Sequence, residues 1–141
     1  MIPIVTVNWL SVVIAAIAAI VIGSIWYSPK VFGTAWMKEM KIDPKKMNKA
    51  EMKKGMQKGM ILMVIGSLVM ASVLSIVLKS VGAVSLMDAV VVALWIAIGF
   101  YATMLLSTVA FEGTSTKLYL IKAFHYIVAL IVMAAILVTW A

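Results

Sequence analysis

The chain has 141 residues, of which 65% are hydrophobic and only 12% are charged, and its mean hydropathy is +1.16. Soluble domains are about half apolar and about a quarter charged, so this composition excludes a soluble domain and indicates an integral membrane protein. The chain carries 12 lysines, 5 acids and no cysteine. It therefore has no disulfide framework, no thiolate metal site and no redox thiol.

Four apolar runs are each long enough to cross a hydrocarbon core, which takes about 20 helical residues. We predict transmembrane helices over residues 4–27, 59–78, 87–111 and 118–140. The first run has no basic leader and its positive charge follows it, so we interpret it as a retained span and not as a cleaved signal peptide. The predicted fold is an all-α antiparallel bundle of four transmembrane helices in a single domain, residues 1–141.

The lysines are distributed unevenly among the predicted loops. Nine of them lie in the first loop, residues 28–58, whereas the second loop contains only Lys79 and the third is flanked by Lys117 and Lys122. By the positive-inside rule the first and third loops are cytoplasmic, so both termini are predicted to lie outside the cell. We expect the basic loop to contact anionic lipid headgroups and not nucleic acid, because it lies between membrane spans.

The basic loop divides at Asp43-Pro44, where an N-cap residue is followed by a proline suited to a first helical turn. Before this point one side of a helix would be apolar and the other basic, which predicts an amphipathic helix in the headgroup plane. The apolar side comprises Phe32, Gly33, Trp36, Met37 and Met40, and the basic side comprises Lys30, Lys38 and Lys41. After Pro44, residues 45–58 are predicted to form a basic cytoplasmic extension of the second span.

Three of the predicted spans carry small residues at every fourth position. The rows are Ser11, Ala15, Ala19 and Gly23 in the first span, Ser67, Ala71 and Ser75 in the second, and Ala89, Ala93 and Ala97 in the third. Small residues let helix backbones approach closely in a membrane. We interpret the rows as packing surfaces within one bundle. The alternative is that one row, most plausibly that of the first span, is a contact between subunits.

Several short motifs stand at the ends of the spans. They are Asn8-Trp9-Leu10, Trp26-Tyr27-Ser28-Pro29, Phe32-Gly33 with Trp36-Met37, and Glu112-Gly113. Together they resemble a family of small prokaryotic and fungal membrane proteins known only as domain of unknown function 1761. The resemblance covers nearly the whole chain and implies a four-span bundle, but it implies no activity. Lys122 departs from this pattern, which has a small polar residue at that position.

The motifs after the first span have a structural interpretation as interfacial anchors. Trp26 and Tyr27 fit an aromatic belt at the cytoplasmic interface, and Pro29 ends the helix. Phe32 and Trp36 would anchor the surface helix in the lipid. A lipid or ligand pocket beneath this turn is the alternative.

Polar residues in and near the fourth span form the main candidate site, because ionisable groups within a membrane are costly and often functional. They are Glu112, Lys122, His125 and Tyr126. As a structural interpretation, Lys122 reaches the interface and His125 bonds to a neighbouring helix. As a functional one, the four residues form a proton or ion relay.

Two other patterns are weaker candidates. Ser85 and Asp88 have the spacing of a capping box, which accounts for the acid without a function. Met52, Met56 and Met60 have the spacing of thioether ligands for copper(I), but methionine also fills gaps between helices, and no cysteine or histidine accompanies them.

The sequence favours a function without catalysis. It has no nucleophile beside a base, no metal-ligand cluster and no phosphate-binding glycine loop, so we expect neither an enzyme nor a cofactor. The best-fitting class is a non-catalytic oligomeric or accessory membrane component, as a homo-oligomer or as a subunit of a larger membrane complex. The alternative is a small transporter or channel for an ion, a proton or a metal.

Overall fold

The computed structural model describes residues 4–141, and every regular element in that range is helical. The elements are α1 (Trp9–Trp26), α2 (Gly33–Glu39), the 3-10 turn η1 (Pro44–Lys46), α3 (Lys49–Ser80), α4 (Leu86–Ile96), the π-helical segment η2 (Ala97–Ala102), α5 (Thr103–Phe111) and α6 (Thr116–Thr139). Because α4, η2 and α5 run on without a break, four helical stretches within residues 4–141 are long and apolar enough to cross a membrane. The predicted all-helical fold, with four helices that are long and apolar enough to span a membrane, is confirmed.

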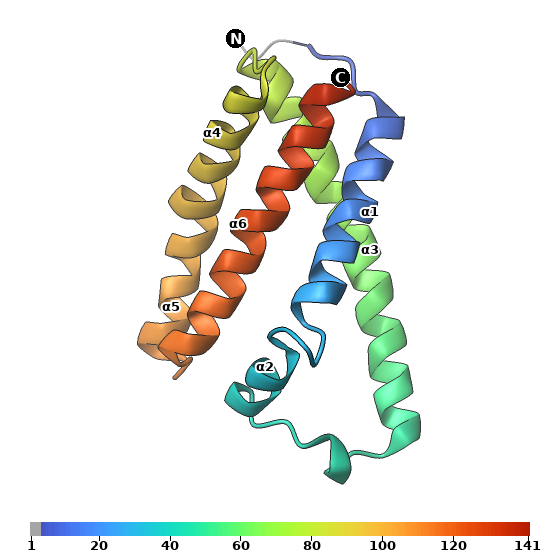
Figure 1. Ribbon diagram of the computed structural model, residues 1–141, viewed down its shortest axis with the longest axis vertical. Coiled ribbons are helices and arrows are strands. Elements are labelled where there is room, and N and C mark those ends of the chain that lie inside the picture. The colour runs from blue at the N-terminus through green and yellow to red at the C-terminus, as the bar shows by residue number, and fades with distance from the viewer. Residues whose placement is uncertain (1–3) are drawn as a thin grey trace.

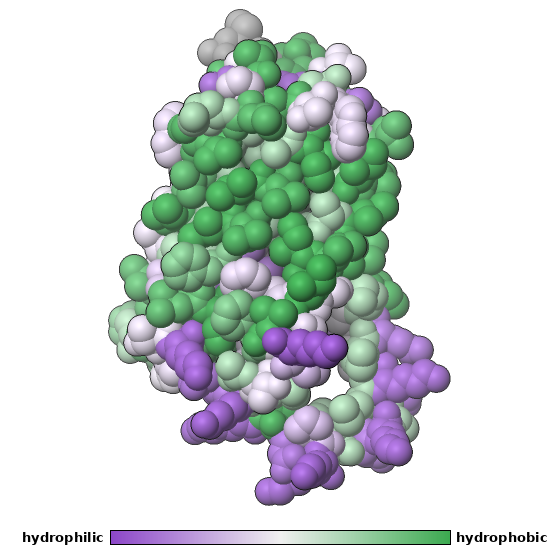
Figure 2. All heavy atoms as spheres, viewed as in Figure 1, coloured by the Kyte–Doolittle hydropathy of each residue, from purple (hydrophilic) through white to green (hydrophobic). Residues whose placement is uncertain are grey.

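Helix α6 lies at the centre of the arrangement (Figure 1). It packs against α1 on one side and against α4 on the other, while α3 packs against both α1 and α6. The start of α1 and the end of α6 lie at one end of the molecule, and α2 and η1 lie at the opposite end (Figure 1). Figure 2 shows an apolar surface along the length of the helices, with the charged side chains gathered at the end that carries α2.

Polar side chains and glycines determine where the helices begin and end. The Asn8 side chain caps α1, and Ser85 and Asp88 form the predicted capping box at the start of α4. Gly113 follows the end of α5 with a φ of +72°, a conformation that glycine adopts without strain. The Thr114 amide can then donate to the Thr108 carbonyl at 3.1 Å, which closes the helix end.

Two helix starts differ from the sequence prediction because asparagines cap the helices later in the chain. Helix α1 begins at Trp9 and not at residue 4, since Asn8 accepts hydrogen bonds from the first helical amides. Helix α3 begins at Lys49 and not at residue 45, since Asn48 accepts from the Ala50 amide at 2.9 Å. Asp43 caps only the short turn η1. From Lys49 onward the basic segment and the second span form one continuous helix.

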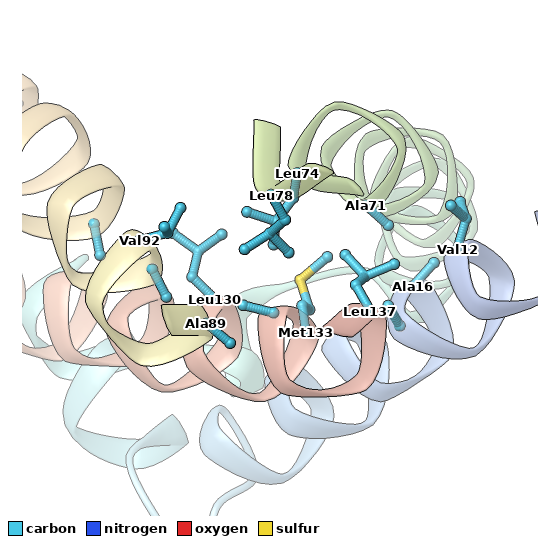
Figure 3. Close-up of a cluster of buried hydrophobic side chains, with 14 residues drawn as sticks. Val12, Ala16, Ala71, Leu74, Leu78, Ala89, Val92, Leu130, Met133 and Leu137 are labelled. Atoms are coloured by element: carbon cyan, nitrogen blue, oxygen red, sulfur yellow. The ribbon is translucent and has the colours of Figure 1, made fainter. Parts of the chain in front are cut away.

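The hydrophobic core fills the half of the bundle nearest the start of α1 and the end of α6. Figure 3 shows side chains from α1, α3, α4 and α6 converging on Met133, which is fully buried. The rows of small residues line these contacts: Ser11, Ala15, Ser67, Ala71, Ser75, Ala89, Ala93 and Ala97 are all buried inside the chain. The rows are therefore occupied by packing within the bundle, where small side chains allow the backbones to approach closely.

The other half of the bundle is looser. Every residue of α3 from Lys53 to Gly66 is exposed, and the buried residues of this helix begin at Ser67. In Figure 1 the N-terminal half of α3 diverges from α1 and α6 toward the end that carries α2. The candidate site lies in this half.

Candidate functional site

Two cavities lie beside each other where α3 diverges from the bundle. The inner cavity, of about 330 Å³, lies between α1, α3 and α6. It is lined by Ala19, Gly23, Gly59, Leu62, Met63, Gly66, Ser67, Met70, His125, Tyr126 and Ala129. The aromatic cavity, of about 520 Å³, lies nearer α2 and is lined by Tyr27, Gly33, Trp36, Met37, Met63, Tyr101, Leu105, Lys122 and Tyr126. The two cavities share Met63 and Tyr126, so they adjoin.

His125 is the most unusual polar residue of the inner cavity. Its side chain is only 7% exposed, and within residues 4–141 neither ring nitrogen has a hydrogen-bond partner. The prediction that His125 bonds to a neighbouring helix is therefore wrong. The cause lies in its neighbours, since the Nε2 edge faces Gly23, where an added Cβ would stand 3.4 Å away. Buried polar groups are normally paired, so an unpaired buried imidazole marks a position with an unmet bonding capacity.

Aromatic rings surround His125 on its remaining sides. Tyr126 and Tyr27 meet the imidazole edge-on, with ring centroids 4.6 and 5.1 Å away, and Trp26 lies at 6.1 Å. Phe32 stacks on Trp26 at 4.7 Å, and the Trp36 ring meets Tyr27 at 5.9 Å. Trp26 and Tyr27 of the Trp-Tyr-Ser-Pro motif thus meet His125 directly, and Phe32 and Trp36 of the Phe-Gly-x-x-Trp motif pack on these two rings.

Trp26 also ties the end of α1 to α6 through its indole. The Nε1–H group donates to the Ile121 carbonyl at 3.1 Å, and the ring is half-buried. Phe32 and Pro29 are exposed, whereas Tyr27 and Trp36 are half-buried and line the aromatic cavity. The structure thus contains a pocket beneath the turn, as the alternative interpretation expected. Membrane anchoring by the exposed members stays a prediction.

Gly33 holds α2 against the turn that follows α1. Its amide donates to the Ser28 carbonyl at 2.8 Å, and a Cβ added at Gly33 would lie 2.2 Å from the Tyr27 carbonyl oxygen. No side chain fits at that distance without moving backbone. The close approach explains why the motif carries glycine here, and it places Trp36 over the aromatic cavity.

The four residues of the predicted relay are only partly brought together. Lys122 is half-buried and lines the aromatic cavity, His125 lines the inner one, and Tyr126 lines both. Glu112 is exposed at the end of α5 and lines neither cavity. Among residues 4–141 no Asp or Glu lines either cavity, and the ionisable residues that do are Lys122, His125 and tyrosines.

The π-helical segment η2 adds a residue that the sequence analysis missed. Tyr101 lies on η2, lines the aromatic cavity and packs on Tyr126 with ring centroids 4.3 Å apart. Nearby hydroxyl groups bond to backbone carbonyls of the π-helical turn. Tyr119 donates to the Ala102 carbonyl at 2.9 Å, and Thr103 donates to the Gly99 carbonyl at 2.8 Å. Single π-helical turns often occur at functional sites. The sequence signal that could have identified Tyr101 is its place within an apolar span, because a buried tyrosine hydroxyl requires a hydrogen-bond partner.

The remaining candidates are divided between the two halves of the bundle. Ala19 and Gly23 of the first row of small residues line the inner cavity, while Ser11 and Ala15 pack in the core. The methionines Met52, Met56 and Met60 line neither cavity. Within residues 4–141 no group of three or more His, Asp or Glu side chains is arranged to hold a metal ion.

A family model described as "Protein of unknown function (DUF1761)" matches residues 10–138, nearly the whole chain. The resemblance inferred from the motifs is thereby confirmed. No curated protein and no solved structure matches the chain. Nothing about an activity follows from these comparisons, so the function has to be argued from the geometry of the two cavities.

Proposed function

Because this chain belongs to that family of proteins of unknown function, we propose from its geometry that it binds an amphiphilic small molecule. The binding site is the pair of adjoining cavities between α1, α3 and α6. The protein would act as a non-catalytic membrane component that captures its ligand from the bilayer.

The unpaired imidazole of His125 carries this proposal. Leaving a buried polar group without a partner costs about 1–3 kcal/mol, and a ligand group in the inner cavity could remove that cost. The rest of the inner cavity is mostly apolar, as in most small-molecule sites, and its volume of about 330 Å³ falls within their usual range. A buried imidazole in a mostly apolar cavity favours a ligand with both an apolar and a polar part.

The lining residues favour binding over catalysis. His125 is hydrogen-bonded to no hydroxyl, so neither Ser67 nor Tyr126 is paired with it as a nucleophile would be with its base. No carboxylate lines either cavity to orient the imidazole. A site of this composition can hold and orient a molecule, and it lacks the paired groups for acid–base or nucleophilic chemistry.

We further propose that the four spans form an antiparallel bundle in the cell membrane with both termini outside. The lysine distribution supports this orientation, and the most hydrophilic residues gather mainly at the end opposite the start of α1 and the end of α6 (Figure 2). Anionic lipid headgroups would then contact α2 and the start of α3. The amphipathic pattern of residues 32–41 supports a position of α2 in the headgroup plane.

Self-association is proposed through α3, as a homo-oligomer or within a larger membrane complex. Residues 59–66 are exposed on all sides of the helix, and a Cβ added at Gly59 or Gly66 would meet nothing within 4 Å. Glycines on an exposed helix surface permit close approach of another helix in the membrane. Native mass determination in a mild detergent decides the number of copies.

A matched pair of glycine variants tests the binding site. Gly66→Leu places a side chain in the inner cavity, whereas Gly55→Leu makes the same change on the same helix outside both cavities. After purification in mild detergent, native mass spectrometry should find a retained amphiphile on the wild type and on Gly55→Leu, and little on Gly66→Leu. Equal retention by both variants would show that the inner cavity is not the site.

A further inference from the structure

The polar groups of the two cavities are arranged in a definite order along the bundle. Lys122 lies in the second turn of α6 and lines the aromatic cavity, while His125 lies one turn deeper and lines the inner cavity. Beyond His125 the inner cavity is mostly apolar, with Met70 and Ala129 on its walls and Ser67 as the hydroxyl-bearing residue. A ligand that occupies both cavities therefore meets a cation, then a hydrogen-bonding group, then hydrocarbon.

Resting on the proposed function, we infer that the ligand is a single-chain amphiphile with an anionic head group. The head, a carboxylate or a phosphate, lies beside Lys122 in the aromatic cavity. The hydrocarbon chain lies in the inner cavity, and His125 bonds to a polar atom next to the head.

The surroundings of Lys122 favour an anion over a neutral or cationic head. Lys122 shares its cavity with Tyr27, Trp36, Tyr101 and Tyr126, and among residues 4–141 no acidic residue lines either cavity. A partly buried cation is costly unless an opposite charge accompanies it, and the interaction is stronger where water is excluded. A ligand carboxylate or phosphate supplies that charge.

The inner cavity fits one chain better than a pair of chains. Its volume is about 330 Å³, and Met63 and Met70 contribute flexible side chains that adapt to an alkyl chain. On the α3 side the lining residues Gly59, Leu62, Met63 and Gly66 are all exposed, so the cavity is accessible from the lipid. His125 supplies one donor and one acceptor when neutral, and within residues 4–141 neither nitrogen has a hydrogen-bond partner.

The depth of Lys122 also matches the position of a head group in a bilayer. Lys122 lies seven residues beyond the N-cap Ser115, a rise of about 10 Å along the helix. It is thus near the end of the bundle where the lysine side chains gather (Figure 2). An amphiphile moving sideways from the cytoplasmic leaflet would bring its head to the level of Lys122 and its chain to the level of the inner cavity.

The test compares four probes on the whole chain in a nonionic detergent: oleate, 1-oleoyl lysophosphatidate, the neutral monoolein and inorganic phosphate. Thermal shift and native mass spectrometry report binding. We expect oleate, lysophosphatidate or both to bind about tenfold more tightly than monoolein. The two anionic amphiphiles distinguish a carboxylate from a phosphate head. Displacement of a bound amphiphile by inorganic phosphate alone would identify a free anion as the ligand and overturn the inference.

Lysine variants test the position of the head. Lys122→Met should abolish the preference for the anionic probes, and Lys122→Arg should retain it. Lys117→Met is the matched control, because Lys117 lies on the same helix but lines neither cavity. If Lys122→Met binds oleate as the wild type does, the anionic head group is overturned.

The proposed function is tested separately with the same probes. Monoolein that binds as tightly as oleate, and is lost in Gly66→Leu, would leave the cavity as the site and reject only the charge of the head. If none of the probes binds to the wild type and Gly66→Leu behaves as Gly55→Leu does, both proposals fail.

Discussion

The carboxylate of Glu39 accepts a hydrogen bond of 2.6 Å from the hydroxyl of Ser115, which itself accepts from the Leu118 amide at 3.1 Å. Ser115 is the N-cap of α6, and Glu39 is the last residue of α2. The Ser115 hydroxyl thus caps α6 and also links α2 to it. The negative charge of Glu39 also lies at the positive end of the α6 dipole, where it is favourable.

Ser115→Ala should lower the free energy of unfolding by about 1–2 kcal/mol, because it removes the cap of α6 as well as the link to α2. Glu39→Ala should cost less, about 0.5–1.5 kcal/mol, because the cap remains. Unfolding in mixed micelles with dodecyl sulfate measures both. The double variant should be no less stable than Ser115→Ala, while exposed Thr116→Ala serves as the control. Strictly additive losses would contradict the shared hydroxyl.

Gly33→Ala should destabilise the turn between α1 and α2. The added Cβ would lie 2.2 Å from the Tyr27 carbonyl oxygen and 2.7 Å from Ser28, so the backbone must shift at a cost of about 1–3 kcal/mol. Gly55→Ala is the matched control, because its Cβ meets nothing and alanine is the better helix former by about 1 kcal/mol. The two substitutions should therefore change the melting temperature in opposite directions. A stabilising Gly33→Ala would show that α2 does not dock as described.

His125→Phe should raise the stability of the ligand-free protein by about 1–3 kcal/mol, because it replaces an unpaired buried polar ring with an apolar one of similar shape. The melting temperature in detergent, after delipidation, measures the effect. The same variant should respond less than the wild type to an added amphiphile. Phe124→Leu, on the same helix but exposed, is the control. A large loss of stability in His125→Phe would mean that the imidazole is bonded in the ligand-free protein.

The first row of small residues should be unequally sensitive along its length. Ala15 is fully buried in the core, whereas Ala19 lines the inner cavity. Ala15→Leu should therefore cost about 1–3 kcal/mol by overpacking, and Ala19→Leu should cost less because space is present. Ile17→Leu, on an exposed face, should be nearly neutral. Thermal denaturation of the four proteins, wild type included, would reject the packing scheme if Ala19 proved the more sensitive position.

Fusions to the C-terminus test the orientation in the membrane. Nine lysines in residues 28–58 against the single Lys79 of the second loop predict that Ala141 lies outside the cell. Alkaline phosphatase fused after Ala141 should be active, and a green fluorescent protein fused there should be dark. The opposite pattern would reverse the orientation of the bundle and move the proposed head-group position to the outer leaflet.

The sequence predicted the spans well because hydropathy and capping are local properties. The capping box of Ser85 and Asp88 needs only neighbouring residues, and the small-residue rows follow from the helical period. The cavity could not be predicted in the same way. His125 lacks a partner because of Gly23, about a hundred residues earlier in the chain, and Tyr101 reaches the site through a π-helical turn that no local pattern announced. Glu112, which was grouped with the site by sequence position alone, is exposed and lines neither cavity.

Because α3 diverges from the bundle, a tilt of this helix would move its N-terminal end much farther than the part beside the inner cavity. Its buried residues begin at Ser67, and its first residue, Lys49, stands about 27 Å farther along the axis at 1.5 Å per residue. A tilt of about 10° around Ser67 would therefore carry Lys49 through about 5 Å, several times the displacement at the neighbouring Met63. If filling the inner cavity tilts α3, the lysines at the start of the helix would move farther than the residues beside the cavity. A fluorescent label at residue 49 would be a far more responsive gauge of occupancy than one placed beside the cavity.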